Sequence, residues 1–179
     1  MRTIVTVAVL AGVLTVPGSG GQDRSTALQA FADGVARYAA LRARYQAPLP
    51  SFDARRDAWS LHLSRLFLAS AIRTARSTAR LGDVFTPPVA QVFRAEVTAA
   101  VHDAGIDGLV DDEDGAPLVD LTVNEPVPGW AMQPVPAALA ARLPALPDAV
   151  EYRRVGDALV LWDARAGILI DALPHAFVG

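Results

Sequence analysis

Prolines between residues 117 and 147 divide this chain into two parts that cannot share one kind of secondary structure. Seven prolines fall in this stretch, at positions 117, 126, 128, 134, 136, 144 and 147. Proline lacks a backbone N–H and has a fixed φ, so it interrupts helix interiors and central strands. Residues 106–149 are therefore predicted to form a long extended connection, with one short helical turn over 137–143.

Before this connection, apolar side chains recur at three- and four-residue spacing, which is typical of amphipathic helices. The first helix is predicted to begin at an N-cap, Ser25, and to end before Pro48. The second is predicted over 53–81, and the third has Thr86 as its cap and Pro87 at its first position. Three helices of this kind need a common core, so they are expected to pack together.

In the second predicted helix, one face is expected to pack on that core while a second stripe is basic. The expected core-facing residues are Trp59, Leu63, Leu66, Phe67 and Ser70. The basic stripe consists of Arg73, Arg76 and Arg80, and the expected C-cap of the helix is Gly82.

After the connection the periodicity changes to alternation, which predicts β-strands. Three strands are expected over 150–155, 158–163 and 168–173, and a two-residue turn at 156–157 joins the first two. A fourth strand is predicted inside the connection, over 119–123. The predicted fold is therefore α+β, with three amphipathic helices packed on a small antiparallel sheet of about four strands that ends in a C-terminal β-meander.

The turn Gly156-Asp157 sets the register of the meander and hence its two faces. It places Val155 opposite Ala158, Tyr152 opposite Leu161, and Arg154 opposite Leu159. The predicted core face carries Tyr152, Arg154, Leu159, Leu161, Ile168 and Ile170. The opposite face carries Glu151, Arg153, Val160, Trp162, Leu169 and Asp171.

The first residues have the pattern of a secretory signal peptide. Arg2 precedes an apolar run over 4–16, and Pro17 and small residues follow it. The run is shorter than the roughly 20 residues that a membrane-spanning helix needs. Cleavage is expected after Gly21, and a cut after Gly20 fits almost as well. The chain is therefore expected to work in the periplasm or outside the cell, with no stable membrane span once residues 1–21 are removed.

Residues 22–179 are expected to form a single α+β domain, because their number is typical of one domain with one core. Its parts are a helical segment over 22–105, the connection over 106–149 and the meander over 150–179.

Composition excludes several kinds of chemistry. The chain has no cysteine, which rules out thiol catalysis and thiolate metal sites. All 16 basic side chains are arginine, so Schiff-base and serine–lysine mechanisms lack their amine. A formal net charge of −3 gives no indication of a nucleic-acid partner.

Two segments resemble an uncharacterised group of exported bacterial proteins. One is Gly82-Asp83-Val84-Phe85-Thr86-Pro87, and the other is the ending with Glu151-Tyr152-Arg153 followed by Leu159-Val160-Leu161-Trp162-Asp163. The resemblance covers most of the mature chain. It implies a helical N-terminal half and a C-terminal β-meander, and it implies no activity or site residue.

No catalytic, cofactor-binding or metal-binding residue is predicted. An acidic stretch suits Ca²⁺ by its oxygen ligands but has no EF-hand frame, so a solvated turn is the alternative. It comprises Asp103, Asp107, Asp111, Asp112, Glu113, Asp114 and Asp120. The three histidines, at 62, 102 and 175, lack metal-ligand spacing. Glu96, at an apolar-stripe position, is expected to pair with an arginine of the second helix.

The candidate interaction surface is the outer face of the meander together with one loop tryptophan. Its residues are Glu151, Arg153, Trp162, Asp171 and Trp130. An aromatic anchor with a charged rim is typical of protein interfaces. The alternatives are that the connection or a helix covers Trp162, and that Trp130 fills the interior of its loop.

These observations predict an exported, non-enzymatic binding or structural module of the cell envelope. Its expected partner is an envelope protein rather than nucleic acid. The alternative is a hydrolase with an Asp/Glu/His site. That alternative would be favoured if Glu96 and one histidine shared a cleft.

Overall fold

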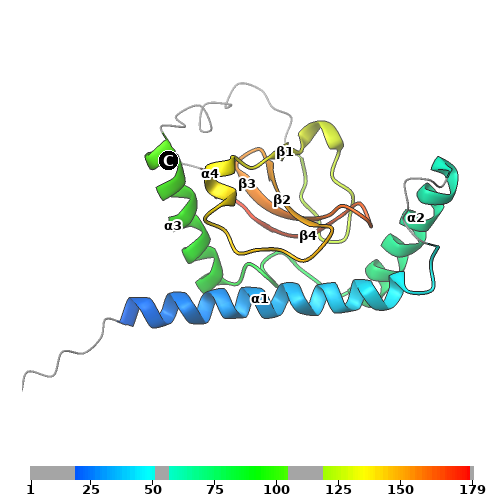
Figure 1. The fold of residues 1–179 in the computed structure, drawn as a ribbon, viewed down its shortest axis with the longest axis horizontal. Coiled ribbons are helices and arrows are strands. Elements are labelled where there is room, and N and C mark those ends of the chain that lie inside the picture. The colour runs from blue at the N-terminus through cyan, green and yellow to red at the C-terminus, as the bar shows by residue number, and fades with distance from the viewer. Residues whose placement is uncertain (1–18, 51–56, 105–118, 178–179) are drawn as a thin grey trace, which may run out of the picture.

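The computed structural model describes residues 19–50, 57–104 and 119–177. In this part of the chain, four α-helices and one four-stranded antiparallel sheet confirm the α+β class. Figure 1 shows α1 (Ser19–Gln46) running beneath the sheet, while α2 (Ala58–Ala75) and α3 (Pro87–Ala104) stand near its opposite ends. α1 is one continuous helix that passes under the whole sheet, and it therefore reaches both α2 and α3.

α3 begins where the sequence predicts, and it packs on the core with one apolar face. The helix begins at Pro87, and Ala90 donates a backbone hydrogen bond of 2.8 Å to the carbonyl of Thr86. Val89, Phe93 and Val97 are buried. Phe93 lies 4.7 Å from Phe31 of α1, measured between ring centroids, so an aromatic contact joins the two helices.

The bounds of the first two helices differ from prediction. α1 already begins at Ser19, so Ser25 lies inside it rather than at its cap. α2 begins after an N-cap at Asp57, whose side chain accepts a 2.9 Å hydrogen bond from the N–H of Ser60. It ends at Ala75 rather than 81, and the predicted start over 51–56 lies outside the described residues.

The early end of α2 has a physical reason in its C-cap. The carbonyl of Arg76 accepts a 3.0 Å hydrogen bond from the side-chain amide of Asn124. The same carbonyl accepts a 2.9 Å bond from the N–H of Ala79, three residues on, so the chain makes a turn there instead of the i to i+4 bond of a continuing α-helix. Gly82 is therefore not the C-cap, although its φ of 89° still needs glycine.

The C-terminal meander has the predicted bounds. β2 (Val150–Val155), β3 (Ala158–Asp163) and β4 (Ile168–Leu173) follow one another in the sheet. Between β2 and β3 the register is as predicted, with Tyr152 opposite Leu161, Arg154 opposite Leu159, and Val155 opposite Ala158. At the turn, the φ of Gly156 is 56°, as a tight hairpin requires.

The fourth strand lies at a place that the sequence pattern missed. It is β1 (Gln133–Pro134), which pairs with Arg154 and Arg153 of β2. Residues 119–123, predicted as a strand, do not form one. Just after them, the N–H of Asn124 donates to the carbonyl of Leu169 at 2.8 Å, and Leu169 returns a 2.9 Å bond to Glu125. Val119 and Leu121 instead pack, partly buried, on the face of the sheet that points away from the helices.

Both faces of the sheet are covered. The face toward the helices forms the inner cluster, which contains Leu159, Leu161, Ile168 and Ile170 together with the buried residues of α1 and α3. The other face forms the outer cluster, which consists of Val127, Val155, Ala158, Val160, Trp162, Leu169 and Ala172. Val127 belongs to the connection, which therefore covers the sheet as a third layer. A 3-10 helix (Gly129–Ala131) and α4 (Ala137–Ala140) also lie in the connection.

A β-bulge interrupts the pairing of β3 with β4. Leu161 lies opposite Asp171, while the next residue, Trp162, lies opposite Leu169. Ile170 is therefore an extra residue on β4, and the side-chain alternation changes phase there. Leu169 and Ala172 both belong to the outer cluster, which leaves Asp171 on the side of the helices.

Candidate functional site

The five residues of the predicted interaction surface do not share one exposed face. The side chains of Glu151 and Arg153 are 39% and 35% exposed and form an ion pair with each other. Trp162 is buried at 9% exposure, because the connection covers the outer cluster to which it belongs. Trp130 is 66% exposed and lies in the 3-10 helix that precedes β1, not on β2, β3 or β4.

Asp171 is fully buried and serves as an anchor for the loop between α2 and α3. Its Oδ2 accepts hydrogen bonds from the N–H groups of Val84 and Phe85, at 2.7 and 2.8 Å. Its Oδ1 accepts from the N–H groups of Gly82 and Ala172, each at 2.8 Å. The prediction that Asp171 lies on the outer face is thus wrong, and the bulge at Ile170 is the cause. A carboxylate held by four N–H groups is a structural clamp rather than a reactive group.

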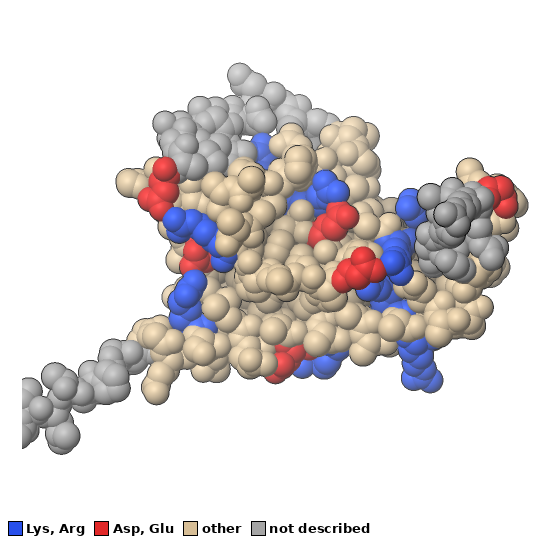
Figure 2. Space-filling model, viewed as in Figure 1, with Lys and Arg blue, Asp and Glu red and all other residues tan. Residues whose placement is uncertain are grey.

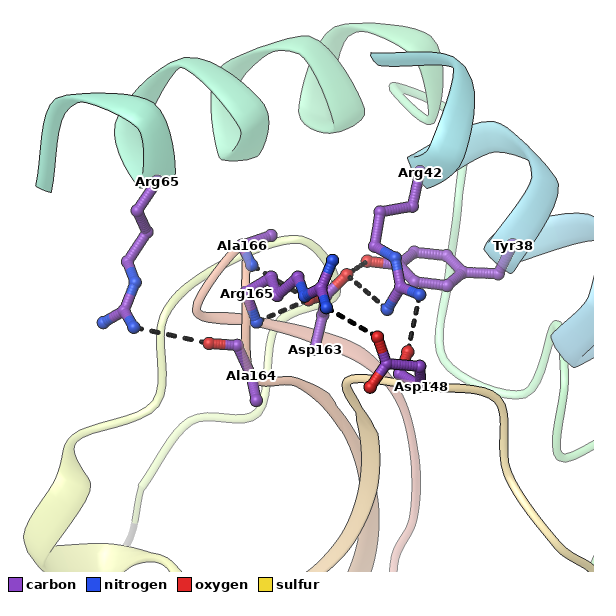
Figure 3. Close-up of polar contacts among 8 residues, drawn as sticks. All are labelled: Tyr38, Arg42, Arg65, Asp148, Asp163, Ala164, Arg165 and Ala166. Carbon is purple, nitrogen blue, oxygen red and sulfur yellow. Dashed lines mark hydrogen bonds and ion pairs between the residues drawn. The ribbon is translucent and has the colours of Figure 1, made fainter. Parts of the chain in front are cut away.

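A second buried carboxylate, Asp163, joins α1 to the turn between β3 and β4 (Figure 3). Its Oδ1 accepts hydrogen bonds of 2.9 Å from the N–H groups of Arg165 and Ala166. Its Oδ2 accepts a 2.6 Å bond from the Tyr38 hydroxyl and lies 3.7 Å from Nη1 of Arg42. Burial, followed by the charge of Asp163, raises the pKa of the Tyr38 phenol far above its ordinary value.

The residues around Asp163 extend this set of polar contacts toward the surface. Arg42 donates from Nη2 to the backbone carbonyl of Asp148 at 2.5 Å, and the carboxylate of Asp148 pairs with Arg165 at 2.6 Å. Arg65 of α2 reaches the carbonyl of Ala164 at 3.4 Å (Figure 3). The residues drawn there connect α1, α2 and the β3–β4 turn, so their combined role is to hold the helices on the sheet.

Glu96 lies at a small cavity between α1, α3 and the segment after α4. The cavity has a volume of about 250 Å³ and is lined by Arg24, Leu28, Val92, Phe93, Glu96, Arg142, Leu143 and Pro144. Glu96 forms ion pairs with Arg24 and, at 3.8 Å, with Arg142. Glu96 therefore does pair with arginine, but Arg24 comes from α1 and Arg142 from the segment after α4, and neither comes from α2.

No histidine lines this cavity. His102 lies near the end of α3 and contacts Asp103 at 3.5 Å, His175 bonds Asp157 at 2.5 Å, and His62 lies beside Trp59. Within residues 19–50, 57–104 and 119–177, no group of three His, Asp or Glu side chains is placed to hold a metal ion. The acidic residues from Asp111 to Asp114 lie outside the described residues. In the described residues, Glu96 and a histidine therefore do not share this cavity.

The most unusual surface of the described chain is one face of α2. Trp59 is 67% exposed, Leu66 51% and Phe67 64%, and Leu63 is half-buried on the same side of the helix. We call these four residues the outward face. Leu68 is nine residues after Trp59, or about two and a half turns, and so lies on the opposite side. Leu68 and Ile72 are fully buried, which shows that α2 is apolar on both sides but packs with only one.

The outward face was expected to pack on the core and is instead exposed, while Arg76 of the predicted basic stripe is half-buried against the body. Arg76 donates to Asn124 Oδ1 at 2.9 Å and to the carbonyl of Ile170 at 3.1 Å. It also lies over the ring of Tyr38, 5.0 Å from the ring centroid. Burial lowers the pKa of this guanidinium. The stem and head of Arg76 thus form part of the packed side, together with Leu68 and Ile72, while Trp59, Leu66 and Phe67 remain outside.

Figure 1 shows that the N-terminal half of α2 projects away from the sheet. Figure 2 shows that charged side chains on the same view of the molecule stand in adjoining acidic and basic groups, without a patch of one sign. No helix in the described residues is long and apolar enough to cross a membrane. Comparison with known proteins finds no matching family model, no matching curated protein and no matching solved structure.

Proposed function

We propose that the protein is an exported, non-enzymatic binding module of the bacterial cell envelope, which works in the periplasm or outside the cell. Its docking surface is the outward face of α2, and the surface that it binds is apolar with negative charge around it. The observation that carries this proposal is the exposure of Trp59, Leu66 and Phe67 on one side of a projecting helix.

Large apolar side chains that are exposed side by side carry a free-energy cost in water that single, scattered ones do not. Single exposed leucines are common, but a contiguous aromatic and aliphatic patch marks an interaction site. Here three of the five exposed large apolar residues of the described chain fall within two and a half turns of one helix, with Leu66 seven and Phe67 eight positions after Trp59. Among the described residues, the body of the protein packs on the opposite side of α2, where Leu68 and Ile72 are buried.

Charge supports the choice of an anionic partner. Residues 58–81 contain four arginines, at 65, 73, 76 and 80, and no aspartate or glutamate. Glu125 pairs with Arg73 at 3.0 Å, so part of this charge is balanced by the body. The acidic residue at the N-cap, Asp57, already accepts hydrogen bonds from the N–H and the hydroxyl of Ser60. The remaining positive charge favours a negatively charged surface.

Two further observations support the proposal. The histidines lie away from the cavity of Glu96, which favours a binding module over the hydrolase alternative. The N-terminal pattern of Arg2, an apolar run and small residues supports export. Intact-mass measurement of the exported product is expected to give an N-terminus at Gln22 or Gly21. Retention of Met1 would contradict the export part of the proposal.

Native membranes provide the test of docking. The full chain is expressed in a bacterium, and its exported product is mixed with inverted and right-side-out vesicles prepared from that cell envelope. We expect Trp59→Ser and Phe67→Ser to reduce co-sedimentation strongly. The matched control is Trp130→Ser, which removes an equally exposed tryptophan from another part of the surface. Equal binding by the Trp59 and Trp130 variants would overturn the proposed docking surface.

A further inference from the structure

We infer that the partner of the outward face is the anionic surface of a lipid bilayer, on which α2 lies as an interfacial helix. This inference rests on the proposed binding function and specifies its partner. An interfacial helix has a strong apolar face with aromatic residues, a basic polar face, and no need to span the bilayer.

The composition of the outward face fits this description. Trp59 is the second residue of the helix and lies 6.0 Å from His62, measured between ring centroids, so an indole and an imidazole ring lie together at the projecting end. Tryptophan prefers the boundary between headgroups and acyl chains, because its ring is apolar and its N–H still finds a polar partner. Leu66 and Phe67 follow on the same side, two turns further along, where they can enter the acyl region.

The size of the outward face argues against a protein partner. The four side chains cover about two turns of helix, whereas a stable interface uses about 20 to 30 residues from each protein. A second copy of the chain would also place one arginine-bearing helix against another, which is unfavourable without acidic residues between them. A membrane does not need a surface whose shape complements the helix, because a few inserted apolar side chains and attraction to anionic headgroups are sufficient for reversible binding.

The position of α2 in the fold permits this contact. The packed side of the helix is fixed to the body by Leu68, Ile72 and Arg76. On the opposite side, Trp59, Leu66 and Phe67 are exposed in the part of the chain that the structure describes. A bilayer can therefore meet the outward face while the sheet and its two apolar clusters stay intact. Binding would not require the domain to unfold or rearrange.

Protein-free vesicles test the inference. The exported product is mixed with vesicles of phosphatidylethanolamine and phosphatidylglycerol, and with vesicles of phosphatidylcholine alone. We expect clear binding to the anionic vesicles, weaker binding to the neutral ones, and a decrease as salt is added. Phe67→Ser is expected to weaken binding roughly tenfold or more, because burial of one such side chain has that effect on a partition equilibrium. Trp130→Ser is expected to change nothing.

Fluorescence provides a second readout. The chain has three tryptophans, and Trp162 is buried, so a Trp130→Phe variant leaves Trp59 as the exposed reporter. Its emission is expected to shift to the blue when anionic vesicles are added and to be quenched by brominated acyl chains. Circular dichroism of each variant checks that the fold is retained.

The outcomes separate the inference from the proposed function. Binding to native envelope vesicles but not to lipid vesicles would overturn the inference, leave the proposed function standing and point to a membrane protein as partner. Binding to neither kind of vesicle would overturn both. A dimer in sedimentation equilibrium that Phe67→Ser dissociates would also overturn the inference, because a second copy would then cover the outward face.

Discussion

The hydroxyl of Tyr38 in α1 donates a 2.6 Å hydrogen bond to Oδ2 of Asp163 at the end of β3, although 125 positions separate the two residues. Both residues are buried, and the same carboxylate holds the N–H groups of the following turn. One side chain therefore fixes a turn of the sheet and the helix that lies beneath it.

Replacing Tyr38 with Phe is expected to destabilise the protein by about 1.5 to 3 kcal/mol, since it removes a hydrogen bond to a buried charge. Tyr152→Phe is the matched control, because Tyr152 donates to a neutral backbone carbonyl, that of Pro144, at 3.1 Å. The control is expected to cost only about 0.5 to 1.5 kcal/mol. Urea unfolding of the two variants measures the difference, and equal losses would contradict a charged acceptor in the first pair.

Asp171→Asn is expected to cost about 3 kcal/mol or more, because an amide NH₂ would face two N–H donors in a buried site. Asp157→Asn provides the comparison. Asp157 is 44% exposed at its side chain, and its backbone carbonyl, which accepts from Ala176 and Phe177, stays unchanged. That control is expected to stay within about 0.5 kcal/mol of the parent. If thermal unfolding shows a small loss for Asp171→Asn, the loop over 82–85 does not depend on this carboxylate.

Trp162→Ala is expected to lower the free energy of unfolding by about 3 to 5 kcal/mol, since the indole fills the outer cluster beneath the connection. Trp130→Ala removes the same side chain from an exposed position and is expected to change stability by less than about 0.5 kcal/mol. Chemical denaturation of both variants measures the contrast. A stable Trp162→Ala protein would mean that the connection does not pack on the sheet, and that Trp162 is available as an anchor after all.

Two buried phenols predict a loss of stability in alkali. Burial raises the pKa of Tyr38 and of Tyr152 far above the ordinary 10.0, and the charge of Asp163 adds to the effect at Tyr38. Because the folded pKa values exceed the unfolded ones, the contribution of each phenol to stability is complete below about pH 10 and is lost as the pH rises further. The expected loss is about 1.4 kcal/mol per pH unit for each phenol.

Absorbance at 295 nm checks this prediction directly. The chain has three tyrosines, and two of them are expected to ionise only when the chain unfolds. The alkaline titration of the native protein should therefore show a delayed phase that urea removes. A Tyr152→Phe variant is expected to lose half of that phase. Ionisation of all three phenols near pH 10 without unfolding would contradict the buried environment.

The meander and α3 were predictable because local chemistry determines them. Gly156 fixes a two-residue turn, which in turn fixes every pair between β2 and β3. Thr86 and Pro87 mark the start of α3 whatever packs on it. In both cases the information lies within a few residues of the element that it defines.

Neither the side of α2 that faces the body nor the face of the sheet on which Asp171 lies was predictable in this way. Periodicity shows that Trp59, Leu66 and Phe67 share a side, but it cannot tell whether the body covers that side or the one with Leu68 and Ile72. The answer depends on Asn124, a distant partner of Arg76. Asp171 depends on a bulge, which moves a side chain to the other face without any change in the hydrophobic pattern.

The candidate site was missed for a related reason. An apolar stripe on a helix normally indicates a core contact, and the arginines beside it normally indicate solvent. One feature of the sequence could have indicated the exposed patch. α2 has large apolar side chains on two opposite sides, and a single packed contact can cover only one side. The residues of the outward face were correctly predicted to share one side of α2, but that side is exposed and does not pack on the core.

The shortness of β1 has a consequence for how the protein behaves at high concentration. One edge of the sheet is a strand of two residues that ends in Pro134, which has no N–H to offer a neighbour. Along the other edge, Asn124 and Glu125 already bond Leu169 of β4. Within the described residues the sheet thus presents no long free edge on which a second molecule could add a strand. Aggregation into cross-β fibrils is therefore expected to require prior unfolding, and native protein is expected to stay free of it even when crowded.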